Sequence, residues 1–128
     1  MDSEILSFVQ KHKTQNYHSI KSKEFSHKNR ICGDLIKIKL KKSDNKIIKF
    51  VYKSDGCLFT QAAALWLSRF IKNKDKTKLK ETINLFLNNK INKSSKTKIY
   101  RKLRNKKYTS RKECVNLPLK ALIKALNK

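Results

Sequence analysis

The two glycines of this 128-residue chain constrain its fold most, because each lies directly beside a cysteine. They occur in Cys32-Gly33-Asp34 and in Gly56-Cys57. Glycine has no Cβ, so the backbone can turn tightly there, adopt a positive φ and approach a ligand closely. The two places where the chain turns most easily are therefore also places where it carries a thiol.

The residues between these two places predict a β-hairpin. Residues 35–40 and 47–52 are rich in β-branched and aromatic side chains, and Ser43-Asp44-Asn45 between them is typical of a turn. After Cys57 the apolar residues change to helical spacing, which predicts a helix with its first turn at Cys57. Further helices are expected at 4–11, 78–88, 99–103 and after Cys114, where Pro118 would be tolerated in the first turn. The connector 13–30 has room for one edge strand, and 89–98 is expected to be a loop.

These elements predict an α+β fold in which a small antiparallel sheet of two to three strands packs against four to five helices. The length suits a single domain spanning residues 1–128, with an N-terminal helix and connector in 1–28.

The net charge of +24 indicates, taken alone, a polyanionic partner. The excess is mostly lysine and is spread along the chain, whereas nucleic-acid readers concentrate charge and favour arginine. We interpret most of the charge as solvated surface. A basic nucleic-acid-binding module stays open as an alternative, using the cluster at 100–104 with Tyr100, Tyr108 and Trp66 as stacking residues.

Three cysteines are an odd number, and the N-terminus has no secretion signal, so a disulfide framework is not expected. The thiols are then free for metal or sulfur chemistry. No apolar run is long enough to span a bilayer, and we expect a cytoplasmic protein without a membrane partner.

The predicted topology brings Cys32, Asp34 and Cys57 toward one end of the sheet, with Cys57 at a helix N-terminus that favours a thiolate. Cys114 is the remaining thiol. Three thiolates and one carboxylate make a four-coordinate zinc site, with Zn–S distances of about 2.3 Å. The alternative is three packed thiols and a turn aspartate. His12, His18 and His27 lie in polar segments and are left out of the site.

At these positions the chain resembles the SufU/IscU family of iron–sulfur cluster assembly proteins, also described as similar to the NifU N-terminal domain. The matching elements are 29–34 around Cys32, Gly56-Cys57 with the alanines 62–64, and Arg111-Lys112-Glu113-Cys114. The resemblance favours the SufU subgroup, since the histidine before the third cysteine and the chaperone-binding stretch of IscU are missing, whereas Arg111 matches an arginine of SufU. The N-terminal 1–28, Arg30 in place of a proline, and the net charge depart from the family.

The resemblance implies a zinc-dependent sulfur relay, with Cys32, Asp34, Cys57 and Cys114 as metal ligands. A pyridoxal-phosphate cysteine desulfurase of SufS type would pass persulfide sulfur to Cys32, and Arg111 would neutralise the released thiolate. Such a protein is a sulfurtransferase-like partner of the desulfurase, not a stand-alone enzyme, and it supplies downstream iron–sulfur assembly proteins. A scaffold that builds a [2Fe–2S] cluster on the same cysteines is the alternative within the family.

Overall fold

The structure is a computed structural model that describes residues 3–11, 17–30, 33–91 and 93–127. Five α-helices and four strands occur in these residues, together with three short 3-10 helices. In chain order they are α1 Ser3–Lys11, η1 Tyr17–Ser19, β1 Phe25–Lys28, β2 Leu35–Ser43, β3 Lys46–Ser54, α2 Leu58–Phe70, β4 Lys74–Asp75, α3 Lys76–Leu87, η2 Ser95–Thr97, α4 Lys98–Leu103, η3 Lys106–Arg111 and α5 Lys112–Leu126.

The strands form one antiparallel sheet in the order β1-β2-β3-β4. Buried and partly exposed residues alternate along β2, so that Ile36, Ile38 and Leu40 point to the core. The β2–β3 turn contains Asp44 at a φ of 55°, a conformation that aspartate adopts more readily than most residues. The predicted hairpin and its turn are therefore confirmed.

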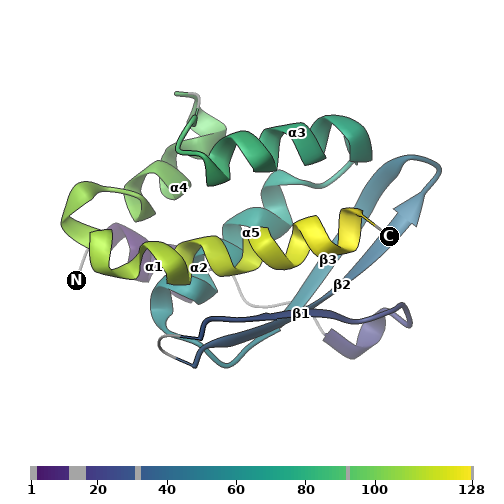
Figure 1. Cartoon of the computed structure of the whole chain (residues 1–128), viewed down its shortest axis with the longest axis horizontal. Helices are drawn as coiled ribbons and strands as arrows, with labels where there is room; N and C mark the ends of the chain where they lie inside the picture. The colour runs from purple at the N-terminus through teal and green to yellow at the C-terminus, as the bar shows by residue number, and fades with distance from the viewer. Residues whose placement is uncertain (1–2, 12–16, 31–32, 92, 128) are drawn as a thin grey trace.

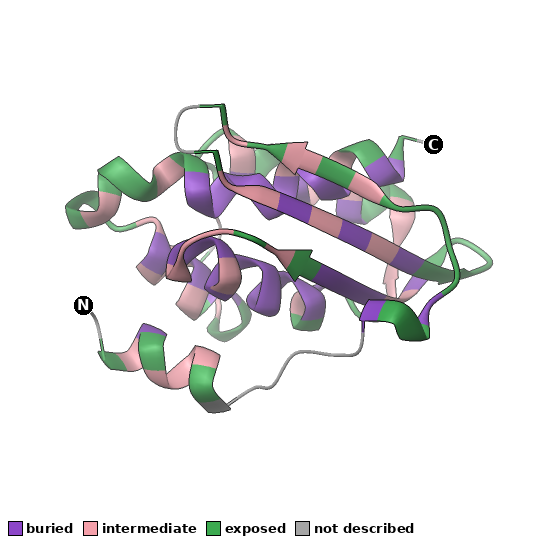
Figure 2. Ribbon diagram, turned by 90° about the horizontal axis from the view of Figure 1, so that it is seen from below, coloured by how far each residue is buried: buried purple, intermediate pink, exposed green. Residues whose placement is uncertain are grey.

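Helices α2 and α5 cross the sheet side by side and cover one of its faces, with α3, α4 and α1 packed outside them (Figure 1). Alternating buried and half-buried positions along the strands show which face of the sheet meets the helices (Figure 2). Helix α2 is buried along most of its length, since it lies between the sheet and the outer helices. The α+β class is thus confirmed, and the short β4 adds a fourth strand to the two or three expected.

Helix α5 begins earlier than the sequence indicated. It starts at Lys112, directly after η3, so Cys114 lies inside its first turn and Pro118 lies beyond that turn. The prediction that Pro118 belongs to the first turn is therefore wrong. The proline lacks an N–H and leaves the carbonyl of Cys114, four residues earlier, without its helical donor.

None of the described helices is both long enough and apolar enough to cross a membrane.

Candidate metal centre

The turn before β2 fixes the position of Asp34. The backbone N–H of Asn29 donates to the carbonyl of Asp34, and the N–H of Gly33 donates to the carbonyl of Asn29, both at 2.8 Å. Gly33 has a φ of +80°, in the left-handed region that glycine adopts without steric cost. The predicted role of this glycine in a tight turn is confirmed. Cys32 precedes it in the sequence and lies outside the described residues.

Cys57 occupies the N-cap position of α2, as expected, with φ −73° and ψ 174°. Its side chain makes no capping bond; instead, its backbone N–H donates to Oδ2 of Asp34 at 3.3 Å. The carboxylate therefore satisfies one of the unpaired N–H groups at the start of the helix, where the helix dipole favours negative charge. Asp34 and Cys57 are joined although 23 residues separate them.

Position 56 requires glycine because there is no room for a side chain between Asp34 and α2. A Cβ at this position would lie 3.1 Å from Cβ of Thr60 and 3.2 Å from Oδ2 of Asp34. Both distances are closer than ordinary van der Waals contact, so a larger residue would push apart the carboxylate and the first turn of α2. The two glycines thus serve different purposes, one for its φ and the other for its missing side chain.

Cys114 reaches the same point from the first turn of α5. Its side chain is buried, and its Sγ lies 3.6 Å from Oδ2 of Asp34. The packing of α5 against α2 brings the two helix N-termini together around the carboxylate. Cys57 is half-buried, so the cluster keeps one thiol partly accessible.

Thr60 contacts all three of these residues and was not predicted as a site residue. Its fully buried hydroxyl donates to the carbonyl of Cys114 at 3.1 Å. The same oxygen lies 3.5 Å from Oδ2 of Asp34 and 3.8 Å from Sγ of Cys57. One threonine among the alanines of a buried helix, three residues after a cysteine, is the only signal that the sequence offered.

The ligand atoms of Asp34, Cys57 and Cys114 all lie within 4.8 Å of one another. Tetrahedral zinc with Zn–S and Zn–O bonds of about 2.3 and 2.1 Å needs a sulfur–oxygen separation of about 3.6 Å. The separation between Cys114 and Asp34 has this value. Two thiols and a carboxylate also suit iron, so the donor set fits a metal of either kind. The structure brings together three of the four predicted ligands and does not describe the fourth.

Arg111 lies at the N-cap of α5, three residues before Cys114, and is exposed to solvent. Within the described part of the chain, no hydrogen bond connects it to Asp34, Cys57 or Cys114. Its predicted role with a released thiolate stays a prediction.

A cleft of about 350 Å³ lies beside the same turn, between β1 and α5, and His27, Arg30, Glu113 and Lys120 are among its lining residues. Nδ1 of His27 is buried and has no hydrogen-bond partner among the described residues. Burial lowers the pKa of His27, and the charges of Lys124, Lys120 and Arg30 lower it further. Both effects favour the neutral form of His27.

Two of the three aromatic residues named for the nucleic-acid alternative, Trp66 and Tyr100, are buried. Trp66 stacks on Phe70 and on Tyr100, with ring centroids 4.7 and 4.6 Å away. Tyr100 is fully buried, and its hydroxyl accepts a hydrogen bond from Arg104 at 2.8 Å. Since Trp66 is buried among these rings, it is not available to stack on bases as that alternative required.

Comparisons with known proteins agree with the fold. The family model described as NifU-like N terminal domain matches residues 5–128. Among solved structures, a protein from Fervidobacterium islandicum AW-1, described by analogy as an iron–sulfur cluster assembly scaffold protein for the SUF system, is 23% identical, with a TM-score of 0.79 over 98% of this chain and 96% of its own. A nitrogen-fixing NifU-like protein (N-terminal) from Brucella abortus is 16% identical, with a TM-score of 0.77 over 98% and 91%. A hypothetical protein is 18% identical, with a TM-score of 0.77 over 100% of both chains. No curated protein matches the chain.

Proposed function

Because this chain belongs to the NifU-like N-terminal domain family of iron–sulfur cluster assembly proteins, we propose that it is a zinc-dependent sulfur relay of SufU type. One observation carries the proposal. Asp34, Cys57 and Cys114 come from three distant segments and place their ligand atoms within 4.8 Å of one another. The carboxylate adds an oxygen donor beside the two thiols, which suits a zinc site and which packing of the thiols alone would not require.

In this proposal Asp34, Cys57 and Cys114 hold one zinc ion together with Cys32. When bound, zinc keeps its sulfur ligands deprotonated at neutral pH, because metal ligation requires the thiolate. The protein backbone fixes the positions of the ligand atoms. The Asn29–Asp34 turn fixes the carboxylate, while the first turns of α2 and α5 hold the two thiols.

The sulfur transfer itself needs no external oxidant. The thiolate of Cys32 attacks the outer sulfur of a persulfide on a pyridoxal-phosphate cysteine desulfurase. The sulfur–sulfur bond of the desulfurase breaks, its electron pair stays on the desulfurase cysteine as a thiolate, and a new sulfur–sulfur bond forms on Cys32. Arg111, exposed near the start of α5, contributes positive charge for the thiolates involved. The persulfide on Cys32 is then passed to downstream iron–sulfur assembly proteins.

A scaffold for a [2Fe–2S] cluster is the second candidate, because the Fervidobacterium neighbour is described by analogy as a scaffold protein. The same thiols would bind the irons. We favour the relay, since Glu113 stands directly before Cys114 where the resemblance to IscU requires a histidine.

A cytoplasmic location belongs to the proposal, because free thiols and persulfides persist in a reducing compartment. The chain then acts with the desulfurase as a sulfurtransferase-like partner and not as an enzyme by itself.

The test is the turnover of a SufS-type desulfurase with and without this protein, measured as alanine released from cysteine. We expect the protein to accelerate turnover and to carry persulfide sulfur detectable by mass spectrometry on Cys32. Cys32→Ala should abolish both, whereas Lys41→Ala, an exposed lysine of β2, should change neither. Equal acceleration by the Cys32→Ala variant would rule out the relay.

A further inference from the structure

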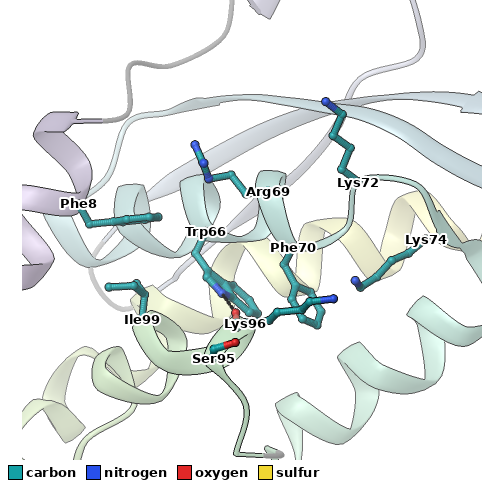
Figure 3. Close-up of a pocket in the computed structure, with 9 residues that line it drawn as sticks. All are labelled: Phe8, Trp66, Arg69, Phe70, Lys72, Lys74, Ser95, Lys96 and Ile99. Carbon is teal, nitrogen blue, oxygen red and sulfur yellow. Dashed lines mark hydrogen bonds between the residues drawn. The ribbon is translucent and has the colours of Figure 1, made fainter.

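A second cavity lies far along α2 from the metal centre. Its volume is about 400 Å³, within the range of small-molecule sites. It opens between the C-terminal half of α2, helix α1 and the segment from η2 into α4 (Figure 3). The lining residues are Phe8, Trp66, Arg69, Phe70, Lys72, Lys74, Ser95, Lys96 and Ile99. None of them belongs to the proposed sulfur-transfer site.

One end of this cavity is apolar. Phe8 from α1 and Ile99 from α4 face the Trp66 side of the cavity in Figure 3, and both are only half-buried. Phe70 lies on the other side of Trp66 in this view and stacks on the Trp66 ring, with the centroids 4.7 Å apart. A flat organic ring of moderate size would cover apolar surface that is otherwise exposed to water.

The other end is cationic. Nζ of Lys74 lies 4.5 Å from the ring centroid of Phe70, and Figure 3 shows the side chain of Lys96 turned toward the same ring. The nine lining residues, all in the described part of the chain, include no carboxylate. Burial lowers the pKa of Lys74, and the charge of Lys96 lowers it further. The two ammonium groups therefore repel each other at a place with no acidic side chain between them.

The segment that carries Lys96 is held in place. Nε1 of Trp66 donates to the carbonyl of Lys96 at 2.8 Å. Ser94 and Thr97 form a reciprocal capping box around η2, and Arg101 donates to the carbonyl of Ser94 at 2.8 Å. Such fixed backbone lowers the entropy lost when a ligand binds.

We propose that this cavity binds a nucleotide-sized organophosphate, with the phosphate between Lys74 and Lys96 and the ring against Phe8 and Ile99. A phosphate monoester carries a charge between about −1.5 and −2 at pH 7, which matches two ammonium groups. Its oxygens would accept charge-assisted hydrogen bonds from both lysines and offset their repulsion. The apolar end of the cavity favours a ligand that also carries a ring. Inorganic phosphate alone therefore binds more weakly than a phosphate ester with a ring.

The test uses Trp66, the single tryptophan of the chain, as its reporter. The full-length protein is titrated at 150 mM salt with each of the four ribonucleoside 5′-monophosphates while tryptophan fluorescence is recorded. At least one should give a saturable change, whereas the matching nucleoside and inorganic phosphate should bind at least about tenfold more weakly. The Lys74→Gln/Lys96→Gln variant should weaken binding by about tenfold or more.

The matched control is Lys41→Gln/Lys53→Gln, which removes the same charge from exposed lysines of β2 and β3. It should bind as the unchanged protein does. Absence of a saturable signal with all four nucleotides would overturn the proposal. Equal weakening in both double variants would do so too, because binding would then follow total charge. Binding of a single-stranded oligonucleotide without binding of any mononucleotide would instead indicate a polyanion surface and overturn it as well.

Discussion

The hydroxyl of Thr60 donates a hydrogen bond to the carbonyl of Cys114 at 3.1 Å. Pro118 leaves this carbonyl without its helical donor, so the threonine supplies the missing partner from the neighbouring helix. The bond fixes the first turn of α5 against the first turn of α2. The hydrogen bond therefore fixes the positions of two proposed metal ligands, Cys57 and Cys114, relative to each other.

Thr60→Val keeps the shape of the side chain and removes the hydroxyl. We expect the metal-free protein to lose about 1–3 kcal/mol of unfolding free energy, because a buried carbonyl is left without a donor. Zinc affinity should fall as well. Urea unfolding and competition with a zinc chelator measure the two effects. Thr60→Ser, which retains the hydroxyl, should recover most of both, and a serine variant no better than valine would contradict the account.

Pro118→Ala tests whether the carbonyl of Cys114 depends on the hydroxyl of Thr60 for its hydrogen bond. Alanine at this position restores an N–H four residues after Cys114, so the carbonyl no longer depends on Thr60. The cost of Thr60→Val should then fall by about 1 kcal/mol in the Pro118→Ala background. A double-mutant cycle of urea unfolding measures this coupling. Strict additivity of the two substitutions would show that they do not share a partner.

The two glycines should respond differently to alanine. At Gly56 the new Cβ meets Thr60 and Asp34 at 3.1 and 3.2 Å, and such overpacking costs about 1–3 kcal/mol. Zinc affinity should decrease with it, because Asp34 is displaced. At Gly33 nothing lies within 4 Å, and the cost of about 1 kcal/mol comes from the positive φ alone. Thermal unfolding and chelator competition on both variants measure these differences, and a Gly56→Ala protein with unchanged zinc affinity would be inconsistent with the crowding at Asp34.

His27 should make the metal-free protein less stable in mild acid. Its folded-state pKa is lowered by burial and by neighbouring cations, so the unfolded chain takes up the proton first as pH falls. The stabilising contribution is complete above the unfolded pKa of about 6.5 and is lost as pH falls through the folded value. His27→Gln should flatten the pH dependence of unfolding free energy below pH 7, measured with a chelator present. A His27→Gln variant with the same pH dependence as the unchanged protein would contradict this account.

The sequence was sufficient for the main elements and for the convergence of Asp34 and Cys57, whereas Cys114 was included as the remaining thiol and through the family resemblance. Alternating residues in 35–40 and 47–52 specified the hairpin, and the switch to helical spacing located the start of α2 at Cys57. The adjacency of glycine and cysteine indicated the site. Gly33 allows the turn that positions Asp34, and Gly56 leaves room for the Asp34 carboxylate beside Cys57.

Other features depend on contacts that no local pattern encodes. The start of α5 was misplaced because η3 runs directly into it, and a 3-10 turn has no strong sequence signal. Thr60 has meaning only once α5 lies beside α2. The two-residue β4 forms because Lys74 and Asp75 pair with the beginning of β3, which is a tertiary contact.

The most direct test of the central claim is the metal and sulfide content of the protein after anaerobic purification. The account predicts about one zinc ion per chain, no visible absorption, and loss of zinc from Cys57→Ser, Cys114→Ser and Asp34→Asn. Asp44→Asn, in the hairpin turn away from the site, should retain it. Iron with inorganic sulfide would indicate a cluster scaffold, and zinc content unaffected by the three site substitutions would contradict the proposed metal centre.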